Sequence, residues 1–486
     1  MLICCRIRTH ISTLQWQSYH VFSKIGMKMS ISQELIRNVV QRGFGDFDSR
    51  TLDYAKIRIL DTIGSMIGGL HSSGVDMMLD IVRTWGGKEE STLLGIGGKF
   101  PAANTVLVLG IAARSNDLEP AGGPEIDGKR SPGHYSATTV PTALAMAEKL
   151  GLSGRDLITA LVLGDDAASR IGTAGAGPWD LGWDPAGTCS RFGAALVAGK
   201  LMGLNEEQLL NALGIAFMQI SGSMLAVMDY THSSKLSQGL AGWNGIISAE
   251  LARRGFSGPR DPLMGQFGYY QQFCREVNPE IITRDLGKIF YADEEFKLYP
   301  CCRGNASSVE TALKLISENN LDVSGIQEIY IDLNPFWKGS FLIQPFKIGP
   351  CSQVSAILNL NYSVASAILR RNSVLENYTD EAIRDPEVLE LANKIRINTA
   401  SNGKRMSCVI RVRMQDNREY SAATEIPRGD YISQPLTKNE IIAKFKSSVA
   451  FSRAIPLEKA ERAIDLLERL EKLTDLDALV AALTPG

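Results

Sequence analysis

The amino-acid sequence predicts a mainly α-helical protein with a smaller α+β unit between two helical stretches of the chain. Apolar residues recur at helical spacing from about residue 30 to about residue 290, and alternating β-rich runs appear only after that point. A leucine-lined helical pattern then returns near the C-terminus. We therefore divide the chain into four segments: an N-terminal extension expected to be disordered (1–29), the first part of a helical domain (30–290), the α+β unit (291–429) and the C-terminal part of the helical domain (430–486).

The predicted helices are marked by apolar faces and by residues that favour helix starts. Ser153, followed three positions later by Asp156, forms an acidic variant of the capping box. Asn205, followed by two glutamates, is a typical N-cap with acidic residues in the first turn. The stretch 188–255 is dense in Ala and Gly, so we expect closely packed core helices there and no strands. The predicted helices cover roughly residues 35–40, 52–67, 139–150, 157–170, 205–222, 307–318, 354–369 and 438–483.

Strand patterns are confined to the predicted α+β unit. Ile326–Leu333 alternates apolar and polar side chains in a β-rich run. Cys408–Met414 is separated by an Asp-Asn pair from Glu419–Ala423, a spacing that predicts a β-hairpin. Because a helical pattern resumes at Lys438 with charged residues opposite its leucines, we expect the C-terminal tail to pack back on the helical domain.

Composition excludes several classes of partner. The 486 residues carry 51 basic and 53 acidic side chains, a net charge of −2, so neither a nucleic-acid surface nor a polybasic membrane patch is indicated. No run reaches the roughly 18 apolar residues that mark a membrane span. We therefore expect a soluble protein whose partners are small molecules or a second copy of the chain.

Cysteine usage and the N-terminus bear on the compartment. Eight cysteines without a CxxC pair fit a reducing compartment better than a disulfide framework. Residues 1–28 contain basic but no acidic side chains, which loosely matches a mitochondrial transit segment. However, Met27 and Met29 stand just before the first predicted helix, so we favour a dispensable or over-extended N-terminus and a cytoplasmic protein.

The loop 117–134 is the first candidate for chemistry, because an acidic, Gly/Pro-rich segment interrupts two helical patterns. Four acidic residues of this loop precede His134 in the sequence: Asp117, Glu119, Glu125 and Asp127. A histidine surrounded by carboxylates is the simplest acid/base device near neutral pH. The alternative is a solvated acidic loop in which the histidine makes structural hydrogen bonds and has no catalytic role.

Polar islands elsewhere supply further candidates. Lys235 and Lys297 lie in such islands, although each lysine alone is more simply a surface residue, because burying an unpaired ammonium is costly. No phosphate-binding loop, nucleophile elbow or HExxH motif occurs. We take as candidate substrate-binding residues Arg130, Trp183, Asp184, Tyr230, His232 and Cys301.

Four motifs, taken in this order and spacing, resemble the MmgE/PrpD family, which includes 2-methylcitrate dehydratase, cis-aconitate decarboxylase and iminodisuccinate epimerase. The resemblance covers roughly residues 30 to 480. The motifs are His134 with Val140-Pro-Thr-Ala-Leu-Ala-Met-Ala-Glu, Gly182-Trp-Asp-Pro-Ala-Gly-Thr-Cys, Lys235 with Ala252-Arg-Arg-Gly-Phe-Ser-Gly-Pro, and Phe296-Lys-Leu-Tyr-Pro-Cys-Cys.

The resemblance implies a fold, an assembly and a set of site residues. It implies a large all-helical domain with an inserted, smaller α+β lid domain, a homodimer, and neither a metal nor an organic cofactor. By motif position, the catalytic residues of the family fall on Asp117, His134, Lys235, Lys297 and Tyr362. Two departures concern the substrate: Asp184 stands where many relatives have a histidine, and the loop 117–134 is longer and more charged than usual.

These residues lead us to expect a cofactor-independent lyase that removes a proton α to a carboxylate of a small polar acid and eliminates a β-substituent. His134 would be the acid or base, with Asp117 setting its tautomer. The two lysines would bind the carboxylate and stabilise the developing charge, and Tyr362 would protonate the leaving group or the carbanion. Epimerisation, decarboxylation and non-catalytic ligand binding remain open alternatives. We expect the site to lie between the helical domain and the lid.

Overall fold

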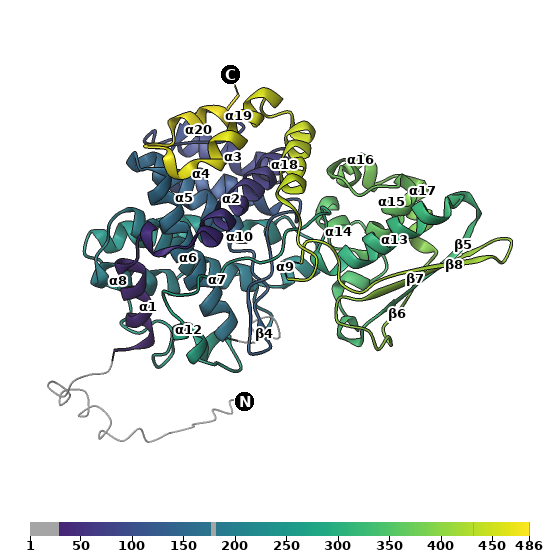
Figure 1. The fold of residues 1–486 in the computed structure, drawn as a ribbon, viewed down its shortest axis with the longest axis horizontal. Helices are drawn as coiled ribbons and strands as arrows, with labels where there is room; N and C mark the ends of the chain where they lie inside the picture. The colour runs from purple at the N-terminus through teal and green to yellow at the C-terminus, as the bar shows by residue number, and fades with distance from the viewer. Residues whose placement is uncertain (1–28, 176–180, 431, 486) are drawn as a thin grey trace, which may run out of the picture.

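The computed structural model describes residues 29–485 except 176–180 and 431. The predicted extension 1–29, with the possible targeting segment 1–28, therefore lies almost entirely outside the described residues. Figure 1 shows a larger helical part on the left and a smaller part, which carries the longer strands, on the right. In the described part of the chain, no helix is both long and apolar enough to cross a bilayer.

The larger part is built from helices and two short hairpins. Two helices begin at the predicted caps Ser153 and Asn205, and the first helix begins with a capping box at Ser30. Its two-residue strands are β1 (Ser91–Thr92), β2 (Lys99–Phe100), β3 (Glu125–Ile126) and β4 (Lys129–Arg130). Its helices before the smaller part are α1 (Ile31–Gln41), α2 (Ser49–Gly69), α3 (Val75–Trp85), α4 (Ala102–Arg114), α5 (Ser136–Leu150), α6 (Gly154–Ala174), α7 (Pro185–Leu201), α8 (Glu206–Phe217), α9 (Leu225–Met228), α10 (Ser233–Arg253), α11 (Tyr269–Phe273) and α12 (Glu280–Thr283).

Glycines set the crossing of α4 and α10. A Cβ atom on Gly239 would lie 2.3 Å from the Leu107 carbonyl oxygen, and one on Gly110 would lie 2.8 Å from the Gly239 Cα. Larger residues are therefore excluded, and the two backbones pack directly against each other. The contact brings the C-terminal end of α4 beside the N-terminal end of α10, one helical turn from Arg114 and from Lys235.

The smaller part consists of a four-stranded sheet covered by helices. The strand order is β6-β5-β7-β8, with β5 and β6 parallel and the other pairs antiparallel. Every second or third side chain of β5 is buried, as its alternating sequence predicts. The strands are β5 (Ile326–Leu333), β6 (Ile395–Asn398), β7 (Cys408–Met414) and β8 (Glu419–Thr424), and the helices are α13 (Ala306–Asn319), α14 (Ser352–Ile357), α15 (Leu360–Arg370), α16 (Asp380–Ile383) and α17 (Pro386–Asn393).

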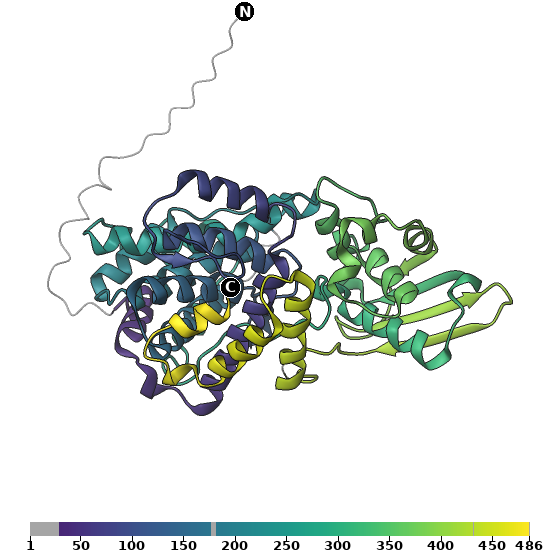
Figure 2. The ribbon, with the colours of Figure 1, turned by 90° about the horizontal axis from the view of Figure 1, so that it is seen from above.

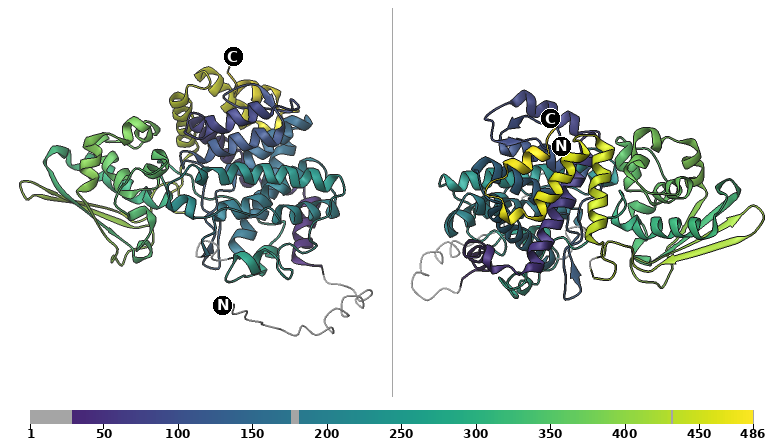
Figure 3. Two further views of the ribbon diagram at one scale, coloured as in Figure 1. Left: turned by 180° about the vertical axis from the view of Figure 1, so that it is seen from behind. Right: turned by 45° about the horizontal axis from the view of Figure 1, so that its top comes forward.

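The C-terminal tail returns to the helical part, as the sequence predicts. It forms α18 (Lys438–Ser452), α19 (Leu457–Glu468) and α20 (Asp477–Ala482). Figures 1 and 2 show these helices over α2 and α4, away from the sheet. Apolar residues of α18 to α20 join one buried cluster with α1 to α8. Residues of the smaller part form a second cluster, which also includes Val227 of α9. Figure 3 shows the larger and the smaller part from behind.

The chain passes from one core to the other slightly later than expected. Phe296 is buried in the helical core, and Glu295 forms a β-bridge with Ala121 of the larger part. The predicted boundary at residue 291 therefore assigns to the smaller part a segment that packs on the larger one. Whether the smaller part moves as a lid stays a prediction.

Candidate active site

The loop 117–134 leaves α4 at Arg114 and enters α5 at Ser136, and it holds three non-glycine residues in a strained backbone conformation. One of them is Asp127 in the hairpin turn, with a φ of 54°. Asp117 has a φ of 49° and His134 a φ of 70°, the left-handed region that non-glycine residues rarely adopt. Such strain persists only where surrounding contacts hold it, and it is concentrated at functional sites. The part of the loop between them forms the β3–β4 hairpin, which the sequence did not predict.

The segment 293–297 holds this loop in place. The carboxylate of Asp293 accepts hydrogen bonds from the backbone N–H groups of Tyr135 at 3.2 Å and Ser136 at 2.7 Å. Two residues later, Glu295 is bridged to Ala121 by backbone hydrogen bonds. The segment 293–297 thus contacts the loop both near its start and at its end. These contacts also place Lys297 beside Asp117.

Four ionisable side chains meet around Glu119. His134 Nδ1 lies 2.6 Å from Glu119 Oε1, and Arg114 lies 3.2 Å from the same oxygen. Lys297 donates to Asp117 and lies 3.7 Å from Glu119 Oε1. Arg114 also donates to Asp117. Two buried carboxylates are therefore matched by two cations, with the histidine at the edge of the cluster.

The charge balance of this cluster fixes its protonation states. Although burial alone raises the pKa of Asp117, the charges of Arg114 and Lys297 hold it well below its usual range. Burial likewise acts against ionised Glu119, but Lys297 and Arg114 lower its pKa. Burial lowers the pKa of Lys297, and the charges of Asp117 and Glu119 more than reverse this effect. Near neutral pH the carboxylates are therefore ionised, and His134 Nδ1 is the donor in its hydrogen bond to Glu119.

Lys235 has different surroundings from Lys297. Its side chain is 2% exposed, yet its Nζ donates only to neutral acceptors, Gln353 Oε1 at 2.6 Å and the Ser73 carbonyl oxygen at 3.3 Å. No carboxylate of the described residues forms an ion pair with it. Burial lowers the pKa of Lys235 to about 8. It is therefore a cation without a counter-ion inside the site.

A lysine of the C-terminal tail supports the loop from behind. Lys444 of α18 donates to the Leu118 carbonyl oxygen at 2.7 Å and to Asp61 of α2 at 2.9 Å. Leu118 lies between Asp117 and Glu119, so this contact fixes the backbone that carries both carboxylates. The tail thus contributes to the site as well as to the core.

The donor atoms of Asp117, Glu119 and His134 lie within 4.8 Å of one another, a spacing that could hold a metal ion. Asp117 Oδ1 is already bonded by Lys297 and Arg114, and Glu119 Oε1 is paired with Arg114 and with His134. A divalent ion would have to displace a buried ammonium and a guanidinium from these oxygens. The cluster therefore fits an ion-paired acid/base site better than a metal centre.

Two predicted roles are corrected by these contacts. Asp117 does not set the tautomer of His134, because Glu119 makes that hydrogen bond. Tyr362 is fully buried in the core of the smaller part, where its hydroxyl donates to the Asn377 carbonyl oxygen at 2.5 Å. Arg370 also contacts that hydroxyl, at 3.5 Å. This enclosed position does not suit a proton donor to substrate.

Some of the predicted substrate-binding residues lie at the edges of the cluster. His232 lies in the turn before Lys235, and its Nε2 is 2.8 Å from Ser73 Oγ. Tyr230 bridges to the smaller part, since its carbonyl oxygen accepts from Cys351 N–H at 3.0 Å. Burial lowers the pKa of the Arg114 guanidinium, but the charges of Asp117 and Glu119, and to a smaller extent that of Asp184, more than reverse this effect. Asp184 thus supplies a carboxylate near the cluster.

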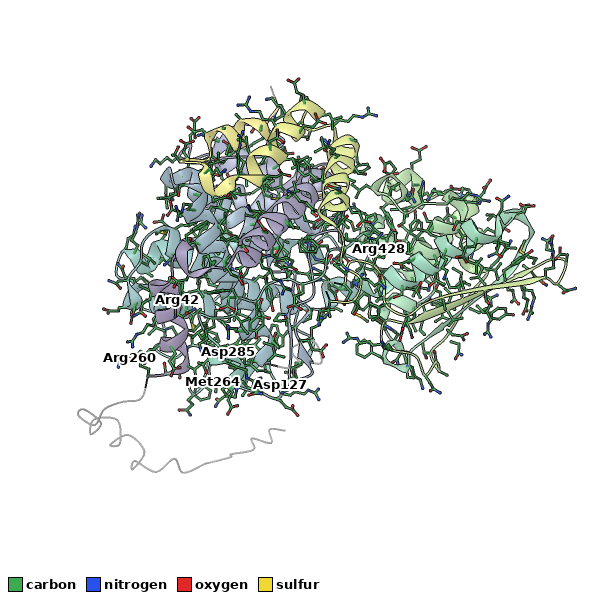
Figure 4. All side chains as sticks on the ribbon, in the orientation of Figure 1. Arg42, Asp127, Arg260, Met264, Asp285 and Arg428 are labelled. Carbon is green, nitrogen blue, oxygen red and sulfur yellow. The ribbon has the colours of Figure 1, made fainter. Side chains whose placement is uncertain are left out.

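Other predicted residues serve the structure. Arg130 pairs with Glu295 at 2.6 Å, and Trp183 packs on Phe273 with ring centroids 4.8 Å apart. Cys301 is buried, which raises the pKa of its thiol far above the usual range. Asp127, at the outer end of the β3–β4 hairpin in Figure 4, pairs with Arg284 at 2.8 Å instead of approaching His134.

Sequence reasoning did not assign roles to Arg114, Asn116, Gln353 or Lys444. Arg114 and Asn116 directly precede the recognised loop, so a search of its flanks could have found them. Gln353 and Lys444 come from α14 and α18, far away in the sequence, and no local pattern distinguishes them from surface residues.

Comparison with known proteins shows the family of this chain. The MmgE/PrpD N-terminal domain matches residues 33–282, and the MmgE/PrpD C-terminal domain matches residues 299–472. The chain belongs to the MmgE/PrpD family. Cis-aconitate decarboxylase of Aspergillus terreus is 23% identical, with 94% of this chain and 96% of that protein aligned. The cis-aconitate decarboxylase-like protein oryM of Aspergillus oryzae is also 23% identical, over 94% of this chain and 97% of its own.

The MmgE/PrpD domain models divide the site between them. Asp117, His134 and Lys235 lie in the N-terminal domain, and Gln353 lies in the C-terminal domain. Asp293 and Lys297 fall in the segment 283–298 between the two matches. In this MmgE/PrpD protein the site is thus assembled from both domains and from the segment that joins them.

Proposed function

We propose that this protein is a cofactor-independent lyase that acts on a small polycarboxylic acid by moving a proton α to a carboxylate. The observation that carries the proposal is the pairing of His134 with the buried Glu119, beside a cluster that contains two cations. Among the described residues, none forms a hydrogen bond to His134 Nε2. That nitrogen is therefore the acceptor that a general base requires.

The proposed reaction begins with binding of a substrate carboxylate by Lys235. His134 Nε2 then takes the α-proton, and the Lys235 ammonium stabilises the negative charge that develops on the carboxylate. Glu119 stabilises the imidazolium that forms and keeps Nδ1 protonated. The protonated histidine afterwards returns its proton to the carbanion or to the leaving group.

Removal of the α-proton can end in loss of water or, when the proton returns to the opposite face, in epimerisation. Loss of carbon dioxide uses His134 in the other direction: the bond between the carboxylate and its carbon breaks, and protonated His134 gives its proton to the carbon that keeps the electron pair. Decarboxylation gains support from the two Aspergillus relatives, whose names specify cis-aconitate decarboxylase activity or likeness to it. Dehydration agrees with the wider family resemblance. Asp184, in place of a histidine, argues for a substrate that differs from that of many relatives.

Incubation of the protein with candidate acids in deuterated water separates these outcomes. Cis-aconitate, citrate and 2-methylcitrate are suitable first substrates. Released carbon dioxide indicates a decarboxylase, a new alkene indicates a dehydratase, and deuterium exchange without net loss of substrate indicates an epimerase. Tight binding of these acids with neither exchange nor turnover would contradict the proposal and favour a non-catalytic binding protein.

We also propose that the protein acts as a homodimer. Exposed large apolar side chains directly after α8 and at the start of α9 support this, since Met218 and Leu225 are 69% and 61% exposed. Sedimentation as a monomer at micromolar concentration would contradict it.

A further inference from the structure

Gln353 connects the two parts of the molecule at the site. It lies on α14 of the smaller part, and its carboxamide oxygen accepts from Lys235 Nζ of the larger part at 2.6 Å. Its Nε2 donates to Asn116 Oδ1 at 2.6 Å and to Ser72 Oγ at 3.2 Å. The carboxamide is thus held on both sides by groups of the helical part.

The groups around this carboxamide are incompletely satisfied. The buried Lys235 ammonium faces a neutral oxygen and no carboxylate, which is a costly arrangement for a charge. Asn116 is 2% exposed, and its Nδ2 has no hydrogen-bond partner. The Asn116 side chain turns its oxygen toward Gln353, because Gln353 Nε2 is a hydrogen-bond donor. The amino group of Asn116 therefore points away from Gln353.

A carboxylate at the same position would satisfy all of these groups. One oxygen would accept from Lys235, and the other would accept from Asn116 Nδ2 after rotation of that side-chain amide. The Ser72 hydroxyl can turn to donate as well. A carboxylate and a primary carboxamide have nearly the same shape, so the replacement requires no additional space.

We propose that the Gln353 carboxamide occupies the position of a substrate carboxylate between Lys235 and Asn116, and that it leaves this position when the substrate binds. The proposal rests on the proposed function, because it takes a polycarboxylate as the substrate. Gln353 is then a specificity-determining residue: only a ligand group that bonds Lys235 better than a neutral amide displaces it. Neutral amides and esters of the same acids should bind poorly.

Two substitutions at this position have opposite expected effects on binding. Tricarballylate, a saturated tricarboxylate, serves as the probe in isothermal titration calorimetry. Q353A removes the internal competitor and should bind tricarballylate at least about tenfold more tightly, the lower end of the range for a lost hydrogen bond to a charged group. Q353E supplies a tethered carboxylate and should bind it at least about tenfold more weakly, because the free position is then rarely populated.

The matched control is Q344E, which places the same new charge on an exposed glutamine of the smaller part. It should bind tricarballylate as the wild-type protein does. Weaker binding by Q353A, or unchanged binding by Q353E, would overturn the proposal, because Gln353 would then assist the substrate or be irrelevant to it.

A second measurement needs no ligand. In Q353E the new carboxylate lies beside Lys235 and gives the buried ammonium its counter-ion, so this variant should have a higher Tm than Q344E near pH 7. This difference in Tm should become smaller above about pH 8, which is the pKa of Lys235 in its wild-type surroundings. Above that pH Lys235 of Q344E is mostly neutral when folded, so it no longer loses stability from an unpaired charge. A lower Tm for Q353E near pH 7 would show that the position rejects a carboxylate and would overturn the inference.

The two measurements separate this inference from the proposed function. If the wild-type protein binds no tricarballylate at millimolar concentration but Q353E is stabilised, the choice of a polycarboxylate substrate fails while the carboxylate position stands. If the wild-type protein binds tricarballylate but Q353E is destabilised, the proposed function stands and the role of Gln353 fails.

Discussion

The Nδ1 atom of His134 lies 2.6 Å from the Oε1 atom of Glu119, a carboxylate that is completely buried. Lys297 and Arg114 keep this carboxylate ionised, so it holds the Nδ1 proton and leaves Nε2 as the basic nitrogen. This hydrogen bond orients the imidazole and leaves Nε2 as the available acceptor, as the proposed role of His134 as a general base requires.

Glu119→Gln should therefore impair catalysis with little effect on substrate affinity. The neutral amide can offer its own N–H to Nδ1 and favour the wrong tautomer, so kcat should fall at least about a hundredfold. Steady-state kinetics would measure kcat and KM separately. Glu125→Gln, at an exposed position of the same loop, is the control and should leave kcat unaltered.

Lys297→Met should reduce both activity and stability. The sequence alone favours a lysine that contributes little to folding, but the side chain is 2% exposed and paired with Asp117. Loss of one partner of a buried ion pair typically costs about 3–5 kcal/mol. Denaturant unfolding should show a loss of this order, and kcat should fall at least about a hundredfold. Asp117→Asn in the same background should recover part of the stability and none of the activity. An unchanged unfolding midpoint for Lys297→Met would contradict the ion-pair network.

Substrate affinity should weaken at alkaline pH because of Lys235. Burial lowers the pKa of its ammonium to about 8, so the charge that binds a carboxylate is present below that pH and is lost above it. KM should therefore rise as the pH increases through about 8. Lys235→Arg should abolish this rise, because a guanidinium stays charged. If KM of the arginine variant still rose with the same midpoint pH, a group other than Lys235 would be responsible for the titration.

The stability effect of Lys235 has the opposite direction. In the unfolded chain the ammonium keeps its proton up to a pKa of 10.5, whereas in the folded protein the pKa is about 8. Below about pH 8 the buried charge lowers stability, and this cost is relieved as the pH rises toward 10.5. Comparison of Tm against pH for the wild-type protein and Lys235→Met measures this difference.

Lys444 should support catalysis through the backbone of the loop. Lys444→Met alone would leave the buried Asp61 carboxylate without its cation, so the double variant Lys444→Met with Asp61→Leu is more informative. Replacing a buried pair by apolar residues is often neutral for stability, yet Leu118 would still lose its hydrogen bond. We expect a double variant of nearly normal Tm with kcat reduced about tenfold or more. Lys446→Met, on the exposed side of α18, should have normal kcat, and normal kcat in the double variant would exclude the positioning role.

Local sequence determined much of the secondary structure. β5 and β7 have the predicted bounds, and the capping boxes at Ser153 and Asn205 begin helices where expected. Other features depended on distant contacts. β6 is short and pairs in parallel with β5, and the helix predicted over 205–222 ends at Phe217. The single helix predicted over 354–369 is two, because Asn359 caps a new start.

The sequence by itself also determined the family and most of the candidate residues, since Asp117, His134, Lys235 and Lys297 stand in recognisable motifs. Tertiary structure decided their roles. Residue spacing along the chain cannot show which carboxylate bonds His134, whether a lysine is paired, or that Tyr362 points into an apolar core. Burial decides these roles, because a charged or polar group inside the protein needs a hydrogen-bond or ion-pair partner. The partners of Lys297, Lys235 and Leu118 come from segments far away in the sequence.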